Sequence, residues 1–166
     1  MRSNFLKIFG LAVFQLAVVS GLSGCDEDSS PVAPVEQDQA VLDAMEATIL
    51  DEYRAELIYE KVLEDFGEVR PFVNIVRAEV RHSESLASLY TSRGLPVPEN
   101  TWSFDDIPAF STLTQACQAG VVAEIENAEV YDRYFDLSLP ADVRTVFENN
   151  RRASIENHLP AFQRSS

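Results

Sequence analysis

Apolar residues recur at steps of three and four along four segments of the chain, which is the period of an amphipathic helix. The first segment runs from about Gln39 to Phe66 and is followed by Gly67. The second begins after Pro71 and stops at Gly94. Proline suits the first turn of a helix, and glycine suits the position just after its end. Because only a few residues separate the two segments, we expect them to pair as an antiparallel hairpin.

The third and fourth segments form a second hairpin. The third runs from about Ser111 to Phe135, and the fourth opens with Pro140 and Asp142 after a short turn. For the third helix we predict a buried face made of Leu113, Ala116, Val122, Ile125 and Val130. Beyond the N-terminal region, no segment shows the sustained alternation of apolar and polar residues that indicates a strand. The sequence therefore predicts an all-α fold.

Sixteen residues, from Leu95 to Phe110, interrupt the helical pattern between the two hairpins. The second helix, with about 23 residues, spans roughly 35 Å, whereas sixteen extended residues reach roughly 50 Å. The connection is therefore long enough to return along the whole bundle. This predicts a third helix parallel to the second, in a ferritin-like four-helix bundle with a long crossover between helices 2 and 3.

Residues 1–24 have the layout of a bacterial export signal. Arg2 and Lys7 precede an apolar run over residues 8–19, which is too short to cross a bilayer comfortably as a permanent helix. Residues 22–25 read Leu-Ser-Gly-Cys and resemble a bacterial lipobox. This resemblance implies that Cys25 becomes the acylated first residue of the mature protein. The alternative is an ordinary secreted precursor cut near the same position.

Residues 25–38 are acidic, contain two prolines and lack apolar periodicity, so we interpret them as a tether to a single domain over residues 39–164. The expected location is the extracytoplasmic side of a bacterial cell-envelope membrane, either inner or outer. Without residues 1–24 the chain has 11 basic and 27 acidic residues, a formal charge of −16. Such a charge repels nucleic acid and anionic lipid, so we expect cations as partners and no nucleic acid.

Charged residues interrupt the apolar face of every predicted helix, where bundle helices usually carry none. They are Glu52 and Glu56 on the first helix, Glu79 and His82 on the second, Glu126 and Glu129 on the third, and His158 on the fourth. Both histidines of the chain belong to this set. On one helix alone, a boundary residue or a satisfied ion pair is the simpler explanation. Four helices together point to a shared buried site.

Several carboxylates in one core repel each other, by roughly 4 kcal/mol for a pair 4 Å apart at an effective dielectric constant of 20. Two divalent metal ions would balance four carboxylates, with two neutral imidazoles as further ligands. Oxygen-rich ligation with imidazole and without thiolate suits iron or manganese better than structural zinc. The sequence therefore predicts a site for two metal ions.

Depth along the helices supports this site in the first hairpin more than in the second. The candidate ligands of the first hairpin lie twelve to fifteen residues from the turn at Gly67. On the second hairpin His158 lies nineteen residues after Leu139, whereas Glu126 and Glu129 lie thirteen and ten residues before it. This difference places His158 roughly 10 Å or more from the depth of Glu126 and Glu129 along the bundle.

These residues resemble the di-iron ferritin-like superfamily, in which one helix gives a Glu and the next a Glu-x-x-His pair. More closely they resemble a bacterial and archaeal ferritin-like family of unknown function. Its second-helix motif Asn-Ile-x-x-Ser-Glu-x-x-His is matched by Asn74, Ile75, Glu79 and His82, with Ala78 in place of Ser. Its third-helix and fourth-helix motifs are matched by Ile125, Glu126 and Glu129, and by Glu148, Asn149, Ser154, Asn157, His158 and Leu159. The resemblance implies Glu52, seven residues before Tyr59, as the first-helix ligand.

The inward Glu and His residues lead to a first functional hypothesis: a lipid-anchored protein with two metal ions, whose iron reacts with dioxygen or peroxide or is bound on a small scale. Manganese is the alternative metal. Two departures change what is expected. Ile155 stands three residues before His158, where ferritin-like oxidases carry Glu, so Glu129 would supply the missing carboxylate. The chain has no Cys-x-x-Cys pair, so electrons would come from a separate, unknown donor. The alternative function is that of a non-catalytic helical lipoprotein that docks a partner or senses a ligand. The sequence leaves open whether the protein forms a homodimer.

Overall fold

The computed structural model describes residues 38–166, so the proposed signal, Cys25 and nearly all of the tether lie outside the described residues. The described part is all-helical, which confirms the all-α part of the predicted fold. Its elements are α1 (Gln39–Phe66), α2 (Phe72–Ser92), the short 3-10 helix η1 (Phe104–Asp106), α3 (Leu113–Asp132), α4 (Ala141–Ala153), the π-helical turn η2 (Ser154–His158) and α5 (Leu159–Gln163). None of these helices is both long and apolar enough to span a lipid bilayer.

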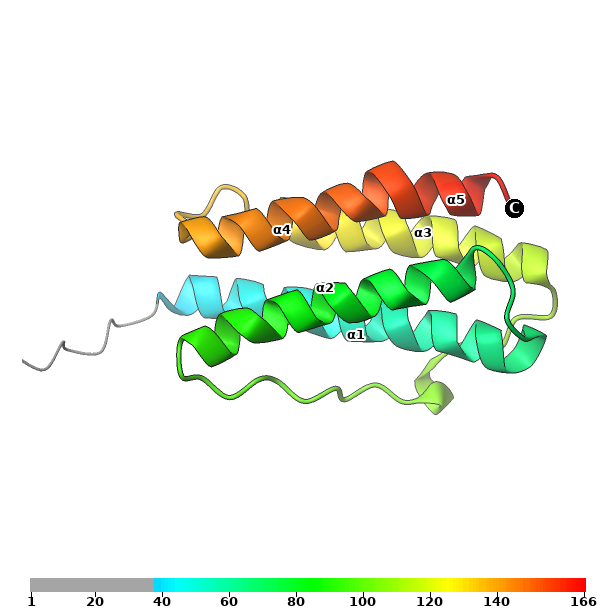
Figure 1. The fold of residues 1–166 in the computed structure, drawn as a ribbon, viewed down its shortest axis with the longest axis horizontal. Coiled ribbons are helices and arrows are strands. Elements are labelled where there is room, and N and C mark those ends of the chain that lie inside the picture. The colour runs from blue at the N-terminus through cyan, green and yellow to red at the C-terminus, as the bar shows by residue number, and fades with distance from the viewer. Residues whose placement is uncertain (1–37) are drawn as a thin grey trace, which may run out of the picture. The chain divides into compact units, whose positions relative to one another are not determined.

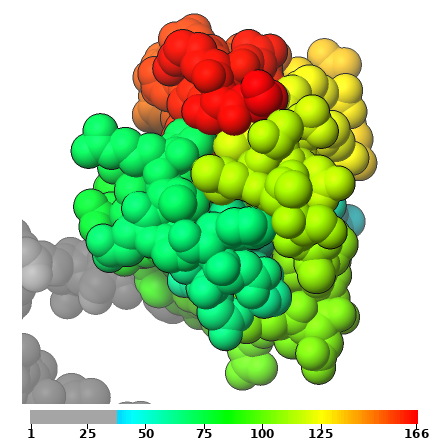
Figure 2. Space-filling model, turned by 90° about the vertical axis from the view of Figure 1, so that its right-hand side faces the viewer, coloured from blue at the N-terminus to red at the C-terminus, as the bar shows by residue number. Residues whose placement is uncertain are grey.

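Four helical rods pack side by side as a bundle (Figure 1). α1 pairs with α2 along most of its length and also packs against α3. α4, η2 and α5 follow one another as a single rod that lies against α3, and α4 also contacts α2. In the space-filling view, the turn between α1 and α2, the start of α3 and the C-terminal residues lie close together at one end (Figure 2).

Local chemistry explains where several helices begin and end. The side chains of Asp38 and Thr112 accept hydrogen bonds from the first turns of α1 and α3, as helix caps do. α1 ends at Gly67, whose positive φ of 80° is unfavourable for residues with a Cβ. The π turn η2 comes just before Pro160, which has no N–H and whose ring clashes with the carbonyl four residues earlier.

Two apolar clusters fill the interior of the bundle. One lies toward the turn between α1 and α2 and contains Tyr59, Phe72 and Phe162. The other contains Met45, Leu86 and Phe147 and lies toward the opposite end. On each rod, the residues between the two clusters include buried polar or charged side chains. A polar layer therefore crosses the middle of the bundle, with apolar packing on both sides.

The linker between α2 and α3 lies along the outside of α1. The indole Nε1–H of Trp102 donates to the carbonyl of Leu50 at 3.0 Å, and the side chain of Ile107 is buried in the cluster around Tyr59. In Figure 1 the linker starts where α2 ends and reaches the opposite end of the bundle before α3 begins. The long irregular segment predicted between the hairpins is therefore present.

Candidate metal centre

Five charged or titratable side chains meet in the polar layer. They are Glu52 of α1, Glu79 and His82 of α2, Glu124 of α3 and His158 of η2, and their exposed fractions are 0, 1, 9, 1 and 5%. All four rods contribute to this group. Carboxylates and imidazoles this deeply buried need compensation by a counter-charge or a metal.

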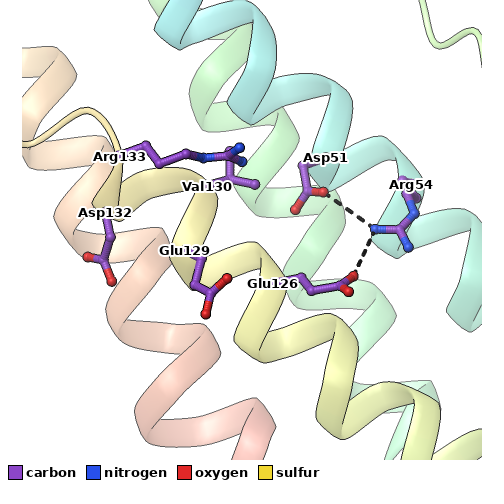
Figure 3. A pocket seen from close by; sticks show the side chains of 7 residues that line it. All are labelled: Asp51, Arg54, Glu126, Glu129, Val130, Asp132 and Arg133. Carbon is purple, nitrogen blue, oxygen red and sulfur yellow. Dashed lines mark hydrogen bonds and ion pairs between the residues drawn. The ribbon is translucent and has the colours of Figure 1, made fainter.

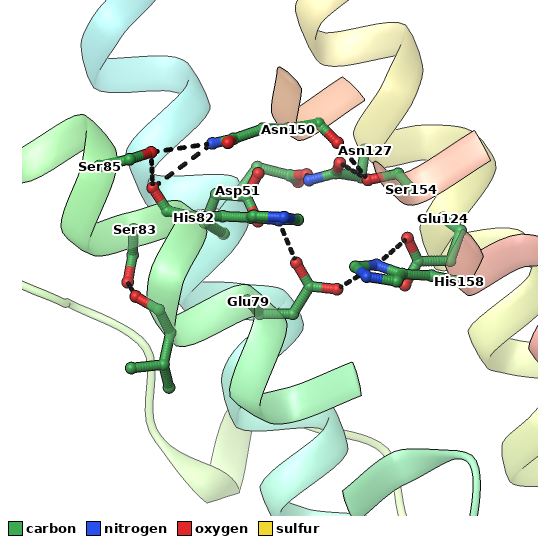
Figure 4. Close-up of polar contacts among 12 residues, drawn as sticks. Asp51, Glu79, His82, Ser83, Ser85, Glu124, Asn127, Asn150, Ser154 and His158 are labelled. Carbon is green, nitrogen blue, oxygen red and sulfur yellow. Dashed lines mark hydrogen bonds and ion pairs between the residues drawn. The ribbon is translucent and has the colours of Figure 1, made fainter. Parts of the chain in front are cut away.

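Glu79 lies at the centre of the group, between the two histidines (Figure 4). Its Oε2 is 2.8 Å from Nδ1 of His82, and its Oε1 is 2.9 Å from Nδ1 of His158. Oε2 of Glu52 lies 3.4 Å from the same nitrogen of His82, and Oε2 of Glu124 lies 3.3 Å from that of His158. The arrangement forms two triads that share Glu79.

We call Glu52, Glu79 and His82 the first triad, and Glu79, Glu124 and His158 the second triad. Within each triad, one potential ligand atom of every residue lies within 4.8 Å of the others. The two imidazole rings are nearly parallel, with an interplanar angle of 21° and centroids 5.4 Å apart. Each triad could therefore hold a metal ion, and the two triads share the carboxylate of Glu79.

The atoms that face this space lack hydrogen bonds. Despite the short N···O distances, no partner in hydrogen-bond geometry is found for Oε2 of Glu52, both carboxylate oxygens of Glu79, Nδ1 of His82, Oε2 of Glu124 and Nδ1 of His158. Buried polar atoms almost always have such a partner, so a cluster of atoms without one marks a place where a ligand could bind. A cation fits once both imidazoles are neutral, because every one of these atoms can then donate a lone pair.

The pKa values follow from burial and from the shared carboxylate. Burial raises the pKa of Glu52 to about 8 and that of Glu124 to about 7. Burial acts in the same direction on Glu79, but contacts with both histidines outweigh it and lower its pKa. Burial lowers the pKa values of His82 and His158, but the adjacent carboxylates outweigh it and raise them to about 10 and about 9. Without metal, Glu79 is therefore an anion between two imidazolium cations.

Two buried tyrosines hold the outer carboxylates in place. The hydroxyl of Tyr131 donates to Oε1 of Glu52, and that of Tyr59 donates to Oε1 of Glu124 at 2.5 Å. Each bond joins α1 to α3 and leaves the second oxygen of the carboxylate facing its histidine. Groups that orient metal ligands in this way raise metal affinity without touching the ion.

Four of the six predicted ligands lie in this centre: Glu52, Glu79, His82 and His158. Glu126 and Glu129 do not, because both are exposed and line an open pocket on the outside of α1 and α3 (Figure 3). That pocket is also lined by Asp51, Arg54, Val130, Asp132 and Arg133, and Arg54 contacts both Asp51 and Glu126. Glu129 therefore does not replace the carboxylate missing from the fourth rod.

The apolar face predicted for the third helix is confirmed at Ala116 and Val130 and wrong at Val122 and Ile125. Val122 is 53% exposed and Ile125 is 41% exposed, whereas the buried face consists largely of small residues such as Gly120 and Ala128. A Cβ on Gly120 would lie 2.7 Å from the ring of Phe162, so this face packs closely. α3 itself carries apolar residues on most of its sides. Their spacing along the sequence therefore did not show which face of the helix is buried.

Sequence reasoning missed Glu124, although the chain contains a signal for it. Glu124 stands seven residues before Tyr131, just as Glu52 stands seven residues before Tyr59. A spacing of seven places both side chains on the same helix face. The repeated Glu-x6-Tyr pattern on α1 and α3 marks the residues whose side chains cross over and bond to each other.

The fourth rod contributes a histidine but no carboxylate. Ile155 is only half-buried, and the fully buried Ser154 donates instead to the side-chain oxygen of Asn127 at 2.7 Å. Asn127 donates in turn to Asp51 at 2.9 Å, so this side of the polar layer carries a hydrogen-bonded chain across three rods (Figure 4). Three carboxylates, rather than the four expected, face the space between the histidines.

No family model, curated protein or solved structure matches this chain. What the fold and the site define is a class: an all-helical bundle with a buried group of glutamates and histidines that could hold a metal ion.

Proposed function

We propose that residues 39–164 form a ferritin-like bundle, with the linker before α3 as its long crossover, that binds two metal ions. The path of the linker supports this topology, because it carries the chain back along the bundle and lets α3 run in the direction of α2 (Figure 1). Ligands from all four rods support the site. Both features agree with the resemblance to ferritin-like proteins found in the sequence.

One observation carries the metal site: two triads of buried ligand atoms without hydrogen-bond partners share Glu79. Each ion would be held by one histidine, one outer glutamate and the shared carboxylate. The donor set of three carboxylates and two imidazoles lacks sulfur, so it suits iron best and manganese next. Apart from Glu79, which is common to both, each ion would have its own pair of ligands.

Such a pair of ferrous ions would supply two electrons, which is enough to reduce one peroxide molecule with two protons to two water molecules, leaving two ferric ions. The contribution of the chain is to hold the ions and to restrict access. The carboxylates of Glu52, Glu79 and Glu124 are at most 1% exposed, so the centre favours dioxygen or peroxide over larger substrates. Electrons for a further cycle would come from a separate donor.

Anaerobic titration of the metal-free protein with ferrous iron tests this function. Two ions per chain should bind, and addition of peroxide should then oxidise both, as followed by ferric absorbance. A parallel titration with Mn²⁺ compares the two metals. Absence of tight uptake of either ion would sink the proposal.

The location proposed for the domain is the extracytoplasmic side of a bacterial envelope membrane, anchored through acylated Cys25. This part rests on the order of charge, apolar run and Leu-Ser-Gly-Cys in residues 1–25. Labelling of cells with a radioactive fatty acid should mark the protein, and Cys25→Ala should abolish the label. A mature N-terminus other than Cys25 would contradict acylation.

A second candidate is a non-catalytic lipoprotein in which the same residues form a structural ion-pair network. It is favoured by the contacts of Glu79 with both histidines, at 2.8 and 2.9 Å, since these compensate charge without a metal. Uptake of two ions by the wild-type protein excludes this alternative. Failure of uptake, together with strong destabilisation by Glu79→Gln, supports it.

A further inference from the structure

Glu56 shares the property that marks the ligands of the metal centre. Among the described residues, buried side-chain oxygen or nitrogen atoms without a hydrogen-bond partner occur in the five residues of the centre and in only one other residue. That residue is Glu56, whose Oε1 is buried although the side chain as a whole is half-buried. An unpaired buried carboxylate oxygen next to a metal centre needs an explanation.

Charge provides a reason for a further carboxylate. Glu52, Glu79 and Glu124 carry three negative charges, whereas two divalent ions carry four positive ones. Uncompensated charge in a buried site is costly, so one more negative group should lie nearby. The fourth rod does not supply it, because Ser154 and Ile155 are uncharged.

Asp51 is a poor source of this charge. One of its oxygens accepts from Asn127 at 2.9 Å, and the other lies 3.7 Å from Arg54, so the carboxylate is already compensated. Glu56, by contrast, forms no ion pair with an arginine or lysine in the part of the chain that the structure describes.

The position of Glu56 suits a role at the first triad. It stands four residues after Glu52 on α1, so the two side chains are neighbours on one face of the helix. Burial raises the pKa of the Glu56 carboxyl, and the charges of Glu60, Glu79 and Glu84 act in the same direction. The hydroxyl of Ser83, on α2, donates its one proton to the carbonyl of Val80 at 3.0 Å, and Oε1 of Glu56 has no hydrogen-bond partner.

We propose that Glu56 is the fourth carboxylate of the metal centre, supplying the negative charge that the fourth rod lacks and an oxygen for the ion at the first triad. The proposal rests on the proposed function, because it requires that the centre binds two ions. It assigns to α1 two carboxylates, Glu52 and Glu56, one turn apart. Partial exposure of Glu56 also lets it meet a cation that arrives from solvent.

The test is Glu56→Gln, with Glu60→Gln as the matched control. Glu60 is exposed and lies one turn further along α1, so its substitution removes the same charge from the same helix. Metal-free proteins are titrated anaerobically with Mn²⁺, and free ion is measured from its electron paramagnetic resonance signal. We expect Glu56→Gln to weaken binding of at least one of the two ions about tenfold or more, and Glu60→Gln to change it less than threefold.

A melting curve in chelator checks folding, and the metal-free Glu56→Gln protein should be at least as stable as wild type, because it has lost a buried carboxylate oxygen without a partner. Equal Mn²⁺ affinity for the two variants would overturn the proposal while leaving the metal centre intact. Failure of wild-type protein to bind Mn²⁺ or Fe²⁺ would instead overturn the proposed function, and this inference with it.

Discussion

The two triads are alike in their outer carboxylates and differ in the rods that carry their histidines. α1 and α3 each present a Glu-x6-Tyr pair, and each tyrosine bonds to the glutamate of the other helix. α2 is regular and directs both Glu79 and His82 inward, whereas the fourth rod opens into a π turn and directs only His158 inward. Each triad therefore has one outer glutamate and one histidine of its own, and Glu79 belongs to both triads.

Loss of Glu79 should have the largest effect because both triads depend on it. We expect Glu79→Gln to abolish binding of two Mn²⁺ ions per chain and to weaken any remaining site by roughly a hundredfold or more, beyond the usual cost of a supporting residue. Equilibrium dialysis against Mn²⁺ measures this. The control is Glu84→Gln, an exposed position on the same helix, which should bind like wild type.

The histidine variants separate the triads. His158→Ala should leave the first triad intact, and His82→Ala should leave the second, so each variant should bind one ion per chain instead of two. Stoichiometry from calorimetric titration with Mn²⁺ checks this. If either variant still binds two ions, the division into two triads is wrong.

Metal binding should depend on pH at both triads, because protons and metal compete for the same atoms. The pKa of His82 is raised to about 10 and that of His158 to about 9 by the adjacent carboxylates, against the opposing effect of burial. Both triads should therefore bind metal more tightly as the pH rises toward these values. Below these values, affinity should rise about tenfold per pH unit for each proton displaced. Titrations of His82→Ala and His158→Ala at several pH values measure the two triads separately.

The metal-free protein should show the opposite dependence on pH. Histidines with raised pKa values stabilise the folded state fully below the unfolded pKa of about 6.5, and this stabilisation is lost as the pH rises through about 9 and 10. Burial also raises the pKa values of Glu52 and Glu124, to about 8 and about 7. Their contribution to the stability of the folded state is therefore lost as the pH rises from about 4.5 to these values. The melting temperature in chelator should fall from pH 6 to pH 10. A melting temperature that rises over this range would show that the histidines are not paired as ions.

The contrast between the two hairpins also explains what the sequence could predict. On α1 and α2, large apolar residues line one face, so the charged residues that interrupt it, such as Glu79 and His82, were assigned to the interior correctly. On α3 the buried face is made of small residues, and Val122 and Ile125 face outward. The spacing of the large apolar residues Val122 and Ile125 therefore pointed to the wrong face of α3.

The mismatch in depth predicted for His158 came from the same error, because its position was compared with Glu126 and Glu129. Counted from Leu139, Glu124 lies fifteen residues back, which is closer to the nineteen of His158 than Glu126 or Glu129. The π turn that ends at His158 was not visible in the period, since it depends on backbone hydrogen bonds before Pro160. The tyrosine–glutamate bonds join α1 to α3, so they hold Glu124 level with Glu52 rather than with a residue of the fourth rod.

The tyrosines should have smaller effects, because they orient ligands without binding the ions. Tyr131 and Tyr59 each fix one outer carboxylate, but the Tyr131 hydroxyl also accepts from Asn150 at 3.2 Å. Tyr131→Phe removes two hydrogen bonds and should weaken Mn²⁺ binding by about tenfold or more, and Tyr59→Phe by somewhat less. Equal effects of the two variants would mean that the bond from Asn150 contributes nothing.

The smallest effects should come from Glu126 and Glu129. Both are exposed, and Glu126 is engaged with Arg54 at 3.5 Å, so Glu126→Gln and Glu129→Gln should change Mn²⁺ affinity less than threefold. Glu124→Gln should weaken binding about a hundredfold, although it removes the same charge from the same helix and only two residues away from Glu126. In chelator, Glu124→Gln should be no less stable than wild type, since its carboxylate is buried against Glu79. The reverse order of affinities would show that α3 directs a different face inward when metal binds.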